Sequence, residues 1–99
     1  MKSKILYIVV PCYKEEEVLP ETSKRLKSKL EALIEQKKID SDSKIMFVND
    51  GSTDNTWKII QELHNSDKIY SGVNLSRNRG HQNALLAGMT VAVEYADMI

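Results

Sequence analysis

Strand-like and helix-like segments alternate along these 99 residues, and this alternation constrains the fold more than any other feature. The first apolar run, Ile5–Val10, is continuous and rich in β-branched residues, which is typical of a strand covered on both faces of a parallel sheet. Two further short runs, Ile45–Val48 and Ile69–Leu75, predict a second and a third strand. The alternation therefore predicts a doubly wound α/β fold, in which a parallel sheet is flanked by helices.

Apolar residues at helical spacing fill the intervals between the predicted strands. We expect Pro11 to end the first strand, and the Asn49–Gly51 stretch to form a turn after the second. Ser52 or Thr53 is expected to cap the second helix. The predicted buried stripes of the three helices are Leu19, Leu26, Leu30, Leu33 and Ile34, then Trp57, Ile60 and Leu63, then Ala84, Leu85, Gly88, Val91 and Tyr95.

Charge and cysteine content narrow the class of protein. Fourteen basic residues balance fourteen acidic ones, so no overall field favours nucleic acid or an anionic membrane. The single cysteine, Cys12, excludes an internal disulfide and favours a cytoplasmic location. The apolar run at the start is too short to span a bilayer and lacks the cleavage pattern of a signal peptide. We expect a soluble protein that holds any anion by local contacts.

The last residues, Tyr95–Ile99, resemble the beginning of a fourth strand with no closing turn or polar tail. We therefore expect residues 1–99 to be the N-terminal, nucleotide-binding part of one larger domain, truncated at the start of its fourth strand. A fragment of this kind is expected to have low stability and to self-associate through exposed apolar surface or an unpaired strand edge.

Polar segments follow each of the three predicted strands directly. They are Pro11–Glu16, Asp50–Asp54 and Arg77–Gln82. Because the carboxyl ends of parallel strands meet at one edge of a sheet, these segments should converge there and form a ligand site. Any one of them alone is equally well explained as an ordinary turn before a helix. Their coincidence carries the functional argument.

The first two segments offer groups that suit a nucleoside. Pro11 fixes the backbone, Tyr13 has an aromatic face that can stack on a base, and the Glu15 carboxylate can accept from ribose hydroxyls. Asp50, directly after a buried strand, can accept a hydrogen bond from a base N–H such as that of uracil or guanine. The two glutamates after Glu15 are better explained by the dipole of the following helix, and Asp54 by its place at a helix start.

The third segment offers groups that suit a diphosphate. Two guanidinium groups precede a predicted helix N-terminus, and Gly80 permits close approach of a ligand to the backbone. We assign phosphate binding to Arg79, which adjoins the glycine, and keep Arg77 as the reserve candidate. No residue of this chain is assigned a catalytic role, and none is assigned to a metal.

Three signatures in the chain resemble those of the family 2 glycosyltransferases, which have a GT-A fold with a Rossmann-like, nucleotide-sugar-binding half. They are Val9–Glu16, Val48–Asp54 and Leu75–Ala84. The third is most similar to the branch that glycosylates polyprenyl phosphates, such as the dolichyl-phosphate mannose synthases and bactoprenol glucosyltransferases. The resemblance implies that Pro11, Tyr13, Glu15 and Asp50 bind the nucleoside of a UDP- or GDP-sugar and that Arg79 lies near its phosphates.

The resemblance also implies parts that these residues do not supply. The family pattern continues with an Asp-x-Asp motif after the fourth strand, which would bind Mg²⁺ or Mn²⁺, and Asp97 is not part of it. The implied parent enzyme transfers a hexose from a nucleoside diphosphate to a polyprenyl phosphate or a glycan, with membrane association through segments outside these residues. The alternative is a nucleotide-binding module without transfer activity. A dinucleotide-binding domain is disfavoured, because no Gly-x-Gly-x-x-Gly follows the first strand.

Overall fold

The computed structural model describes residues 4–78 and 80–99. Strands and helices alternate, as the sequence predicts, and the three strands form one sheet in the order β1-β2-β3, with both neighbouring pairs parallel. The elements are β1 (Tyr7–Cys12), α1 (Leu19–Glu35), β2 (Lys44–Asp50), α2 (Thr56–Ser66), β3 (Tyr70–Leu75) and α3 (His81–Ala92).

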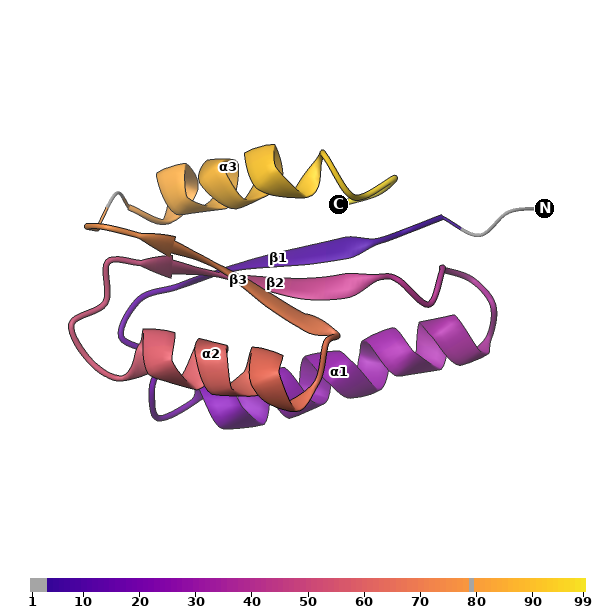
Figure 1. Ribbon diagram of the computed structural model, residues 1–99, viewed down its shortest axis with the longest axis horizontal. Helices are drawn as coiled ribbons and strands as arrows, with labels where there is room; N and C mark the ends of the chain where they lie inside the picture. The colour runs from indigo at the N-terminus through magenta and orange to yellow at the C-terminus, as the bar shows by residue number, and fades with distance from the viewer. Residues whose placement is uncertain (1–3, 79) are drawn as a thin grey trace.

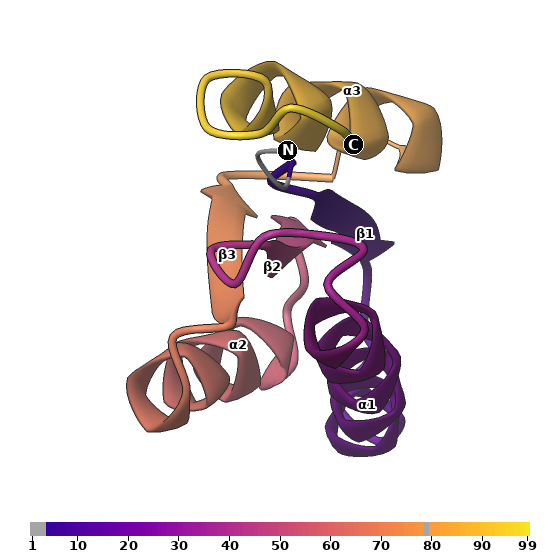
Figure 2. The same cartoon turned by 90° about the vertical axis from the view of Figure 1, so that its right-hand side faces the viewer.

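Helices cover the sheet on both faces (Figure 1). Seen along the strands, α1 and α2 lie side by side beneath the sheet and α3 lies above it (Figure 2). The predicted α/β class with a parallel sheet between helices is therefore confirmed.

A fourth segment begins to pair with the sheet after α3. Leu6 and Met98 form an isolated parallel bridge, and the Tyr7 N–H donates to the Met98 carbonyl at 2.9 Å. This contact lies on the edge of β1 that faces away from β2, so the order of segments across the sheet is β3, β2, β1 and then Met98. The chain thus reverses its direction of winding at β1, and ligands of doubly wound folds bind at such a reversal, outside the carboxyl ends of the strands.

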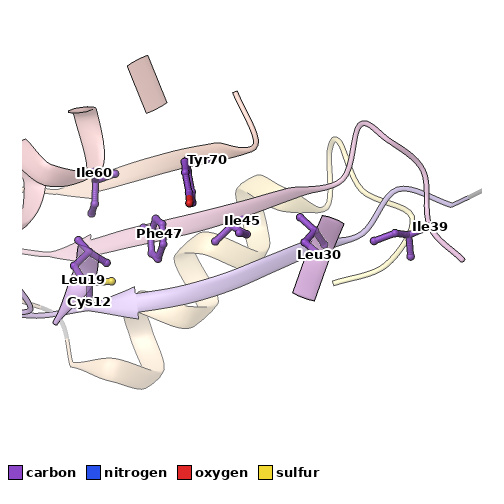
Figure 3. Packing of buried hydrophobic residues seen from close by; sticks show 8 residues of the cluster. All are labelled: Cys12, Leu19, Leu30, Ile39, Ile45, Phe47, Ile60 and Tyr70. Atoms are coloured by element: carbon purple, nitrogen blue, oxygen red, sulfur yellow. The ribbon is translucent and has the colours of Figure 1, made fainter. Parts of the chain in front are cut away.

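The larger core lies between the sheet and the pair α1 and α2 (Figure 3). Phe47 and Ile45 on β2 are fully buried, and the Phe47 ring stacks on Tyr70 with 6.1 Å between centroids. The Tyr70 hydroxyl donates to the Ser23 carbonyl of α1 at 3.0 Å. Each large apolar side chain buried in this way contributes roughly 1.5–3 kcal/mol. The buried members of this core are Cys12, Leu19, Leu30, Ile39, Ile45, Phe47, Ile60 and Tyr70.

The ends of β1 and β2 differ from the prediction. Pro11 does not end the first strand but lies within it, opposite Val48 of β2. A proline is tolerated there because a parallel strand directs alternate N–H groups to its two sides, and only one side of Pro11 faces β2. Asn49 and Asp50 belong to β2 rather than to a turn, and the turn begins at Gly51, whose φ is +68°.

The start of α2 also differs from the prediction. The residue at the N-cap is Asn55, and neither Ser52 nor Thr53 caps the helix. The Ser52 hydroxyl instead accepts from the Lys14 N–H at 2.9 Å, so tertiary contact between two loops takes the place of local capping.

The buried stripe of α3 is narrower than predicted. Ala84 and Ala92 have no exposed surface, and Gly88 lies so close to the sheet that a Cβ there would come within 2.6 Å of Val9 Cγ1. Small residues at every fourth position let the helix backbone approach β1 and β2. Leu85, Val91 and Tyr95, which were predicted to be buried, are exposed. Within the described part of the chain, no helix is long and apolar enough to cross a membrane.

Candidate functional site

The β1–α1 loop (residues 13–18) and the β2–α2 loop (residues 51–55) are joined by two hydrogen bonds. The Lys14 N–H donates to Ser52 Oγ, and the Glu15 N–H donates to Thr56 Oγ1 at the first turn of α2, both at 2.9 Å. Sequence reasoning missed Ser52 and Thr56 as linking residues. The only sequence feature that pointed to such links was the number of hydroxyl side chains in and beside the second loop. Capping of the following helix explained that feature equally well.

The β3–α3 loop (residues 76–80) packs on the same end of the sheet through Gly51. A Cβ on Gly51 would lie 2.7 Å from Arg77 Cα and would overlap the backbone nitrogen of Asn78. Only a residue without a side chain permits this approach, and the positive φ of Gly51 also favours glycine. The prediction that three polar loops converge at one sheet edge is therefore confirmed.

Asn49 and Asp50, the last two residues of β2, are both buried polar residues. Side chains alternate along a strand, so Asp50 shares a face with Met46 and Val48, the face that α3 covers. Asp50 is 1% exposed, so its carboxylate is closed to solvent in this conformation. Asn49 lies on the opposite face and bonds to Asn74.

Pro11, Tyr13 and Glu15 lie together along the end of β1. Pro11 and Glu15 line a cavity of about 190 Å³, and Glu15 also lines a second cavity of about 200 Å³ on the side of Asp54. Each cavity is smaller than the roughly 300–1,000 Å³ of a typical ligand site. Tyr13 is half-buried, and the Lys14 ammonium lies 5.3 Å from the centre of its ring. A base stacking on that face would displace the lysine.

Asp54 forms hydrogen bonds that fix the first residue of α2. Its carboxylate accepts from the Thr56 hydroxyl at 2.5 Å and from the Thr56 N–H at 3.0 Å. The hydrogen bond from the Thr56 hydroxyl is the main cause that lowers the pKa of Asp54, with further backbone donors adding to it. Asp54 thereby orients the Thr56 hydroxyl, which accepts the hydrogen bond from the Glu15 N–H. This role agrees with the predicted place of Asp54 at the start of a helix.

The β3–α3 loop, to which the sequence assigns phosphate binding, is described except for one residue. Arg79 lies outside the described residues, and Arg77 is exposed. Gly80 has a φ of +84° at the N-cap of α3, and its N–H donates to Asn78 Oδ1 at 3.0 Å. Across residues 4–78 and 80–99, no group of three or more histidine, cysteine, aspartate or glutamate side chains is placed to hold a metal ion. The described side chains of these three loops do not fit a divalent ion.

The end of the sheet thus combines three loops, a buried carboxylate and the start of a helix. The family described as "Glycosyl transferase family 2" matches residues 7–94, nearly the whole chain. The chain belongs to this family. The match includes all three loops at this edge of the sheet.

Individual relatives of the chain are also named as glycosyltransferases or sugar transferases. This family 2 chain is 48% identical to an uncharacterised glycosyltransferase of Bacillus subtilis, YkoT, over 95 residues, which are 96% of the chain and 28% of that protein. It is 41% identical over 85 residues to a second one, YkcC, from the same organism. It is 33% identical over 86 residues to the undecaprenyl-phosphate 4-deoxy-4-formamido-L-arabinose transferase of Proteus mirabilis, covering 86% of the chain and 24% of that enzyme. The chain spans about a quarter of the length of these relatives.

Proposed function

We propose that the whole protein transfers a hexose from a UDP- or GDP-sugar to an acceptor, and that residues 1–99 supply the nucleotide-binding part. The observation that carries this proposal is the joining of three polar loops at the point where the winding of the sheet reverses. Doubly wound folds bind nucleotides in this place, and membership of family 2 gives the reaction class.

Within this proposal the nucleoside is held by Pro11, Tyr13, Glu15 and Asp50. Pro11 and Glu15 already share a cavity, and the half-buried Tyr13 lies between them in the chain. Asp50 supplies an acceptor in a site screened from water, where a hydrogen bond to a charged group is worth more than in solvent. Arg79, which lies outside the described residues, is proposed for the diphosphate on its sequence position alone.

We propose a polyprenyl phosphate as the acceptor, with a glycan as the other choice. Two relatives, from Proteus mirabilis and Pseudomonas syringae, are named as undecaprenyl-phosphate transferases, and they match the chain at 33% and 37% identity. The names of these two relatives specify an arabinose derivative as the sugar. A phosphate acceptor carries its own nucleophilic oxygen, and the enzyme then needs chiefly to hold the reactants and stabilise the departing diphosphate.

Metal chemistry is assigned to residues beyond this chain. The expected ligand of the departing diphosphate is Mg²⁺ or Mn²⁺ held by an Asp-x-Asp motif after the fourth strand. The Asp40-Ser41-Asp42 sequence precedes β2, at the opposite end of the strands from the three loops, and is not that motif. We propose a cytoplasmic location, with the whole protein at the cytoplasmic face of the membrane. The second candidate function is a nucleotide-binding module that does not transfer sugar.

Calorimetric titration of UDP, GDP and their sugars, with and without Mn²⁺, tests the binding role of residues 1–99. Radiolabelled UDP-glucose and GDP-mannose, offered with polyprenyl phosphate to the 99-residue chain and to the full-length protein, test transfer. The proposal expects binding by both proteins and transfer only by the full-length one. Binding without transfer by the full-length protein would favour the second candidate, and transfer by residues 1–99 alone would show that the catalytic groups are misplaced.

We also propose that the 99-residue chain self-associates through the outer surface of α3. Between Ala84 and Val93 the chain has no charged residue, so no like-charge repulsion opposes contact between two copies. A two-fold arrangement would bring the same apolar surface of both copies into contact. The exposed side chains of this apolar α3 face are Leu85, Leu86, Met89, Val91, Val93 and Tyr95.

A further inference from the structure

The Asn49 carboxamide forms hydrogen bonds through both of its ends. Its Nδ2 donates to Asn74 Oδ1 on β3 at 2.8 Å, and its Oδ1 accepts from the Ser52 N–H at 3.3 Å. Asn49 is 2% exposed and lies in the register position opposite Asn74. A buried amide is costly unless its polar atoms are paired, and here the pairing ties the end of β3 to the β2–α2 loop.

The connection continues from Ser52 into the β1–α1 loop. Ser52 Oγ accepts from the Lys14 N–H at 2.9 Å, and Lys14 has a φ of +52°, in the left-handed region. A residue with a side chain is strained in this region and stays there only where its surroundings fix it. The bond to Ser52 is such a restraint, and it acts between Tyr13 and Glu15, the two residues proposed for base and ribose.

We propose that Asn49 is a positioning residue for nucleotide binding, which holds the β1–α1 loop in the conformation that the nucleoside requires. This inference rests on the nucleotide-binding role proposed above. Asn49 itself touches no ligand in the proposal, because its side chain lies on the face of the sheet opposite to Asp50. It acts through Ser52 and Lys14, and its backbone also fixes the position of Asp50, the next residue.

The position requires an acceptor for the Ser52 N–H and a polar partner for the Asn74 carboxamide. Asn49→Ala removes both bonds, leaving the Ser52 N–H and Asn74 Oδ1 without these partners. Asn49→Asp keeps the acceptor for Ser52, and the Asn74 carboxamide, which is exposed, can turn its NH₂ group toward the new carboxylate. The aspartate variant is therefore the conservative replacement that should rescue the position.

A matched control separates positioning from loss of stability. Ser23 is also buried, at 1% exposed, and its hydroxyl donates to the Pro20 carbonyl within α1 at 2.7 Å. Ser23→Ala thus removes a buried hydrogen bond that has no part in the three loops. The wild-type chain, Asn49→Ala, Asn49→Asp and Ser23→Ala are compared by melting temperature, by calorimetric titration with UDP and GDP, and by hydrogen exchange of backbone amides.

The proposal expects Asn49→Ala to bind the nucleotide about tenfold more weakly, and the Lys14 and Ser52 amides to exchange about tenfold faster without ligand. Asn49→Asp should stay within about threefold of wild type in both measurements. Ser23→Ala should lower the melting temperature and leave both unchanged. Equal affinity for Asn49→Ala and wild type would overturn the proposal, as would equal losses for Asn49→Ala and Ser23→Ala.

The two readouts keep this inference apart from the proposed function. If the wild-type chain bound neither UDP nor GDP, with or without Mn²⁺, the nucleotide-binding role of residues 1–99 would fail. The exchange rates of Lys14 and Ser52 in the ligand-free chain would then decide whether Asn49 holds the loop. Unchanged exchange in Asn49→Ala would overturn the positioning role whether or not the nucleotide binds.

Discussion

Gly51 lies directly against the backbone of Asn78, in a space that no larger residue can share. A Cβ on Gly51 would overlap the Asn78 nitrogen, and the φ of +68° is itself unfavourable for other residues. We predict that Gly51→Ala lowers the free energy of unfolding by about 2 kcal/mol, because the β3–α3 loop must move and the left-handed conformation becomes strained. Urea denaturation measures this change.

Gly80 provides the control for Gly51. Its φ is also positive, at +84°, but a Cβ there would meet nothing within 4 Å. Gly80→Ala should therefore lower the free energy of unfolding through backbone strain alone, because a φ of +84° with a ψ of 150° is essentially restricted to glycine. An unchanged free energy of unfolding for Gly51→Ala would mean that the β2–α2 and β3–α3 loops are not packed together.

Self-association through the apolar α3 face is predicted to depend on Leu86, which is 61% exposed. Leu86→Lys should leave a monomer at concentrations where the wild-type chain sediments as a dimer, because it places two like charges in the contact between copies. Val18→Lys is the control, since Val18 is 51% exposed but lies before α1, away from this face. Dimers that persist in Leu86→Lys and dissociate in Val18→Lys would contradict the proposed interface.

Cys12 is predicted to make the fold sensitive to alkaline pH. Burial, with a smaller contribution from the Glu15 carboxylate, raises the pKa of its thiol from the ordinary 9.0 to about 12. The unfolded chain loses this proton above about pH 9 while the folded chain keeps it, so the free energy of unfolding falls as the pH rises from about 9 towards 12. Burial also raises the pKa values of Tyr7 and Tyr70, and these tyrosines act in the same direction.

Cys12→Ala isolates the contribution of the thiol, because both tyrosines remain. Urea denaturation of the two proteins at several pH values should show a shallower alkaline decline for Cys12→Ala. Parallel declines would show that the thiol is exposed to solvent in the folded chain.

The order of elements could be predicted because hydrophobic periodicity reflects burial on each element. Ile45 and Phe47 are fully buried where the apolar run placed them, and Leu19 and Leu30 mark the buried side of α1. The stripe of α3 could not be read in this way. Its residues are apolar on nearly every side, and the face that meets the sheet is chosen by small size, at Ala84, Gly88 and Ala92, rather than by hydrophobicity.

The site was predictable as a place but not as a set of contacts. Residues that follow parallel strands must gather at one edge, so the meeting of the three loops could be foreseen from the sequence. The bonds from Lys14 to Ser52 and from Glu15 to Thr56 join residues 38 and 41 positions apart. No local pattern specifies such pairs, and local rules assigned Ser52 to capping instead. Pro11 can lie within β1 because of the way β1 pairs with β2, and this pairing exists only in the assembled sheet.

The central claim is that the buried Asp50 carboxylate and the residues around it bind a nucleoside. Calorimetric titration of UDP and GDP into the wild-type chain, Asp50→Ala and Glu17→Ala tests it most directly, with melting temperatures confirming that each variant is folded. Glu17 is exposed and is assigned no contact with the base. We predict that Asp50→Ala weakens binding by about 1–3 kcal/mol and that Glu17→Ala leaves it unchanged. Equal affinity of folded Asp50→Ala and the wild-type chain for both nucleotides would contradict the account.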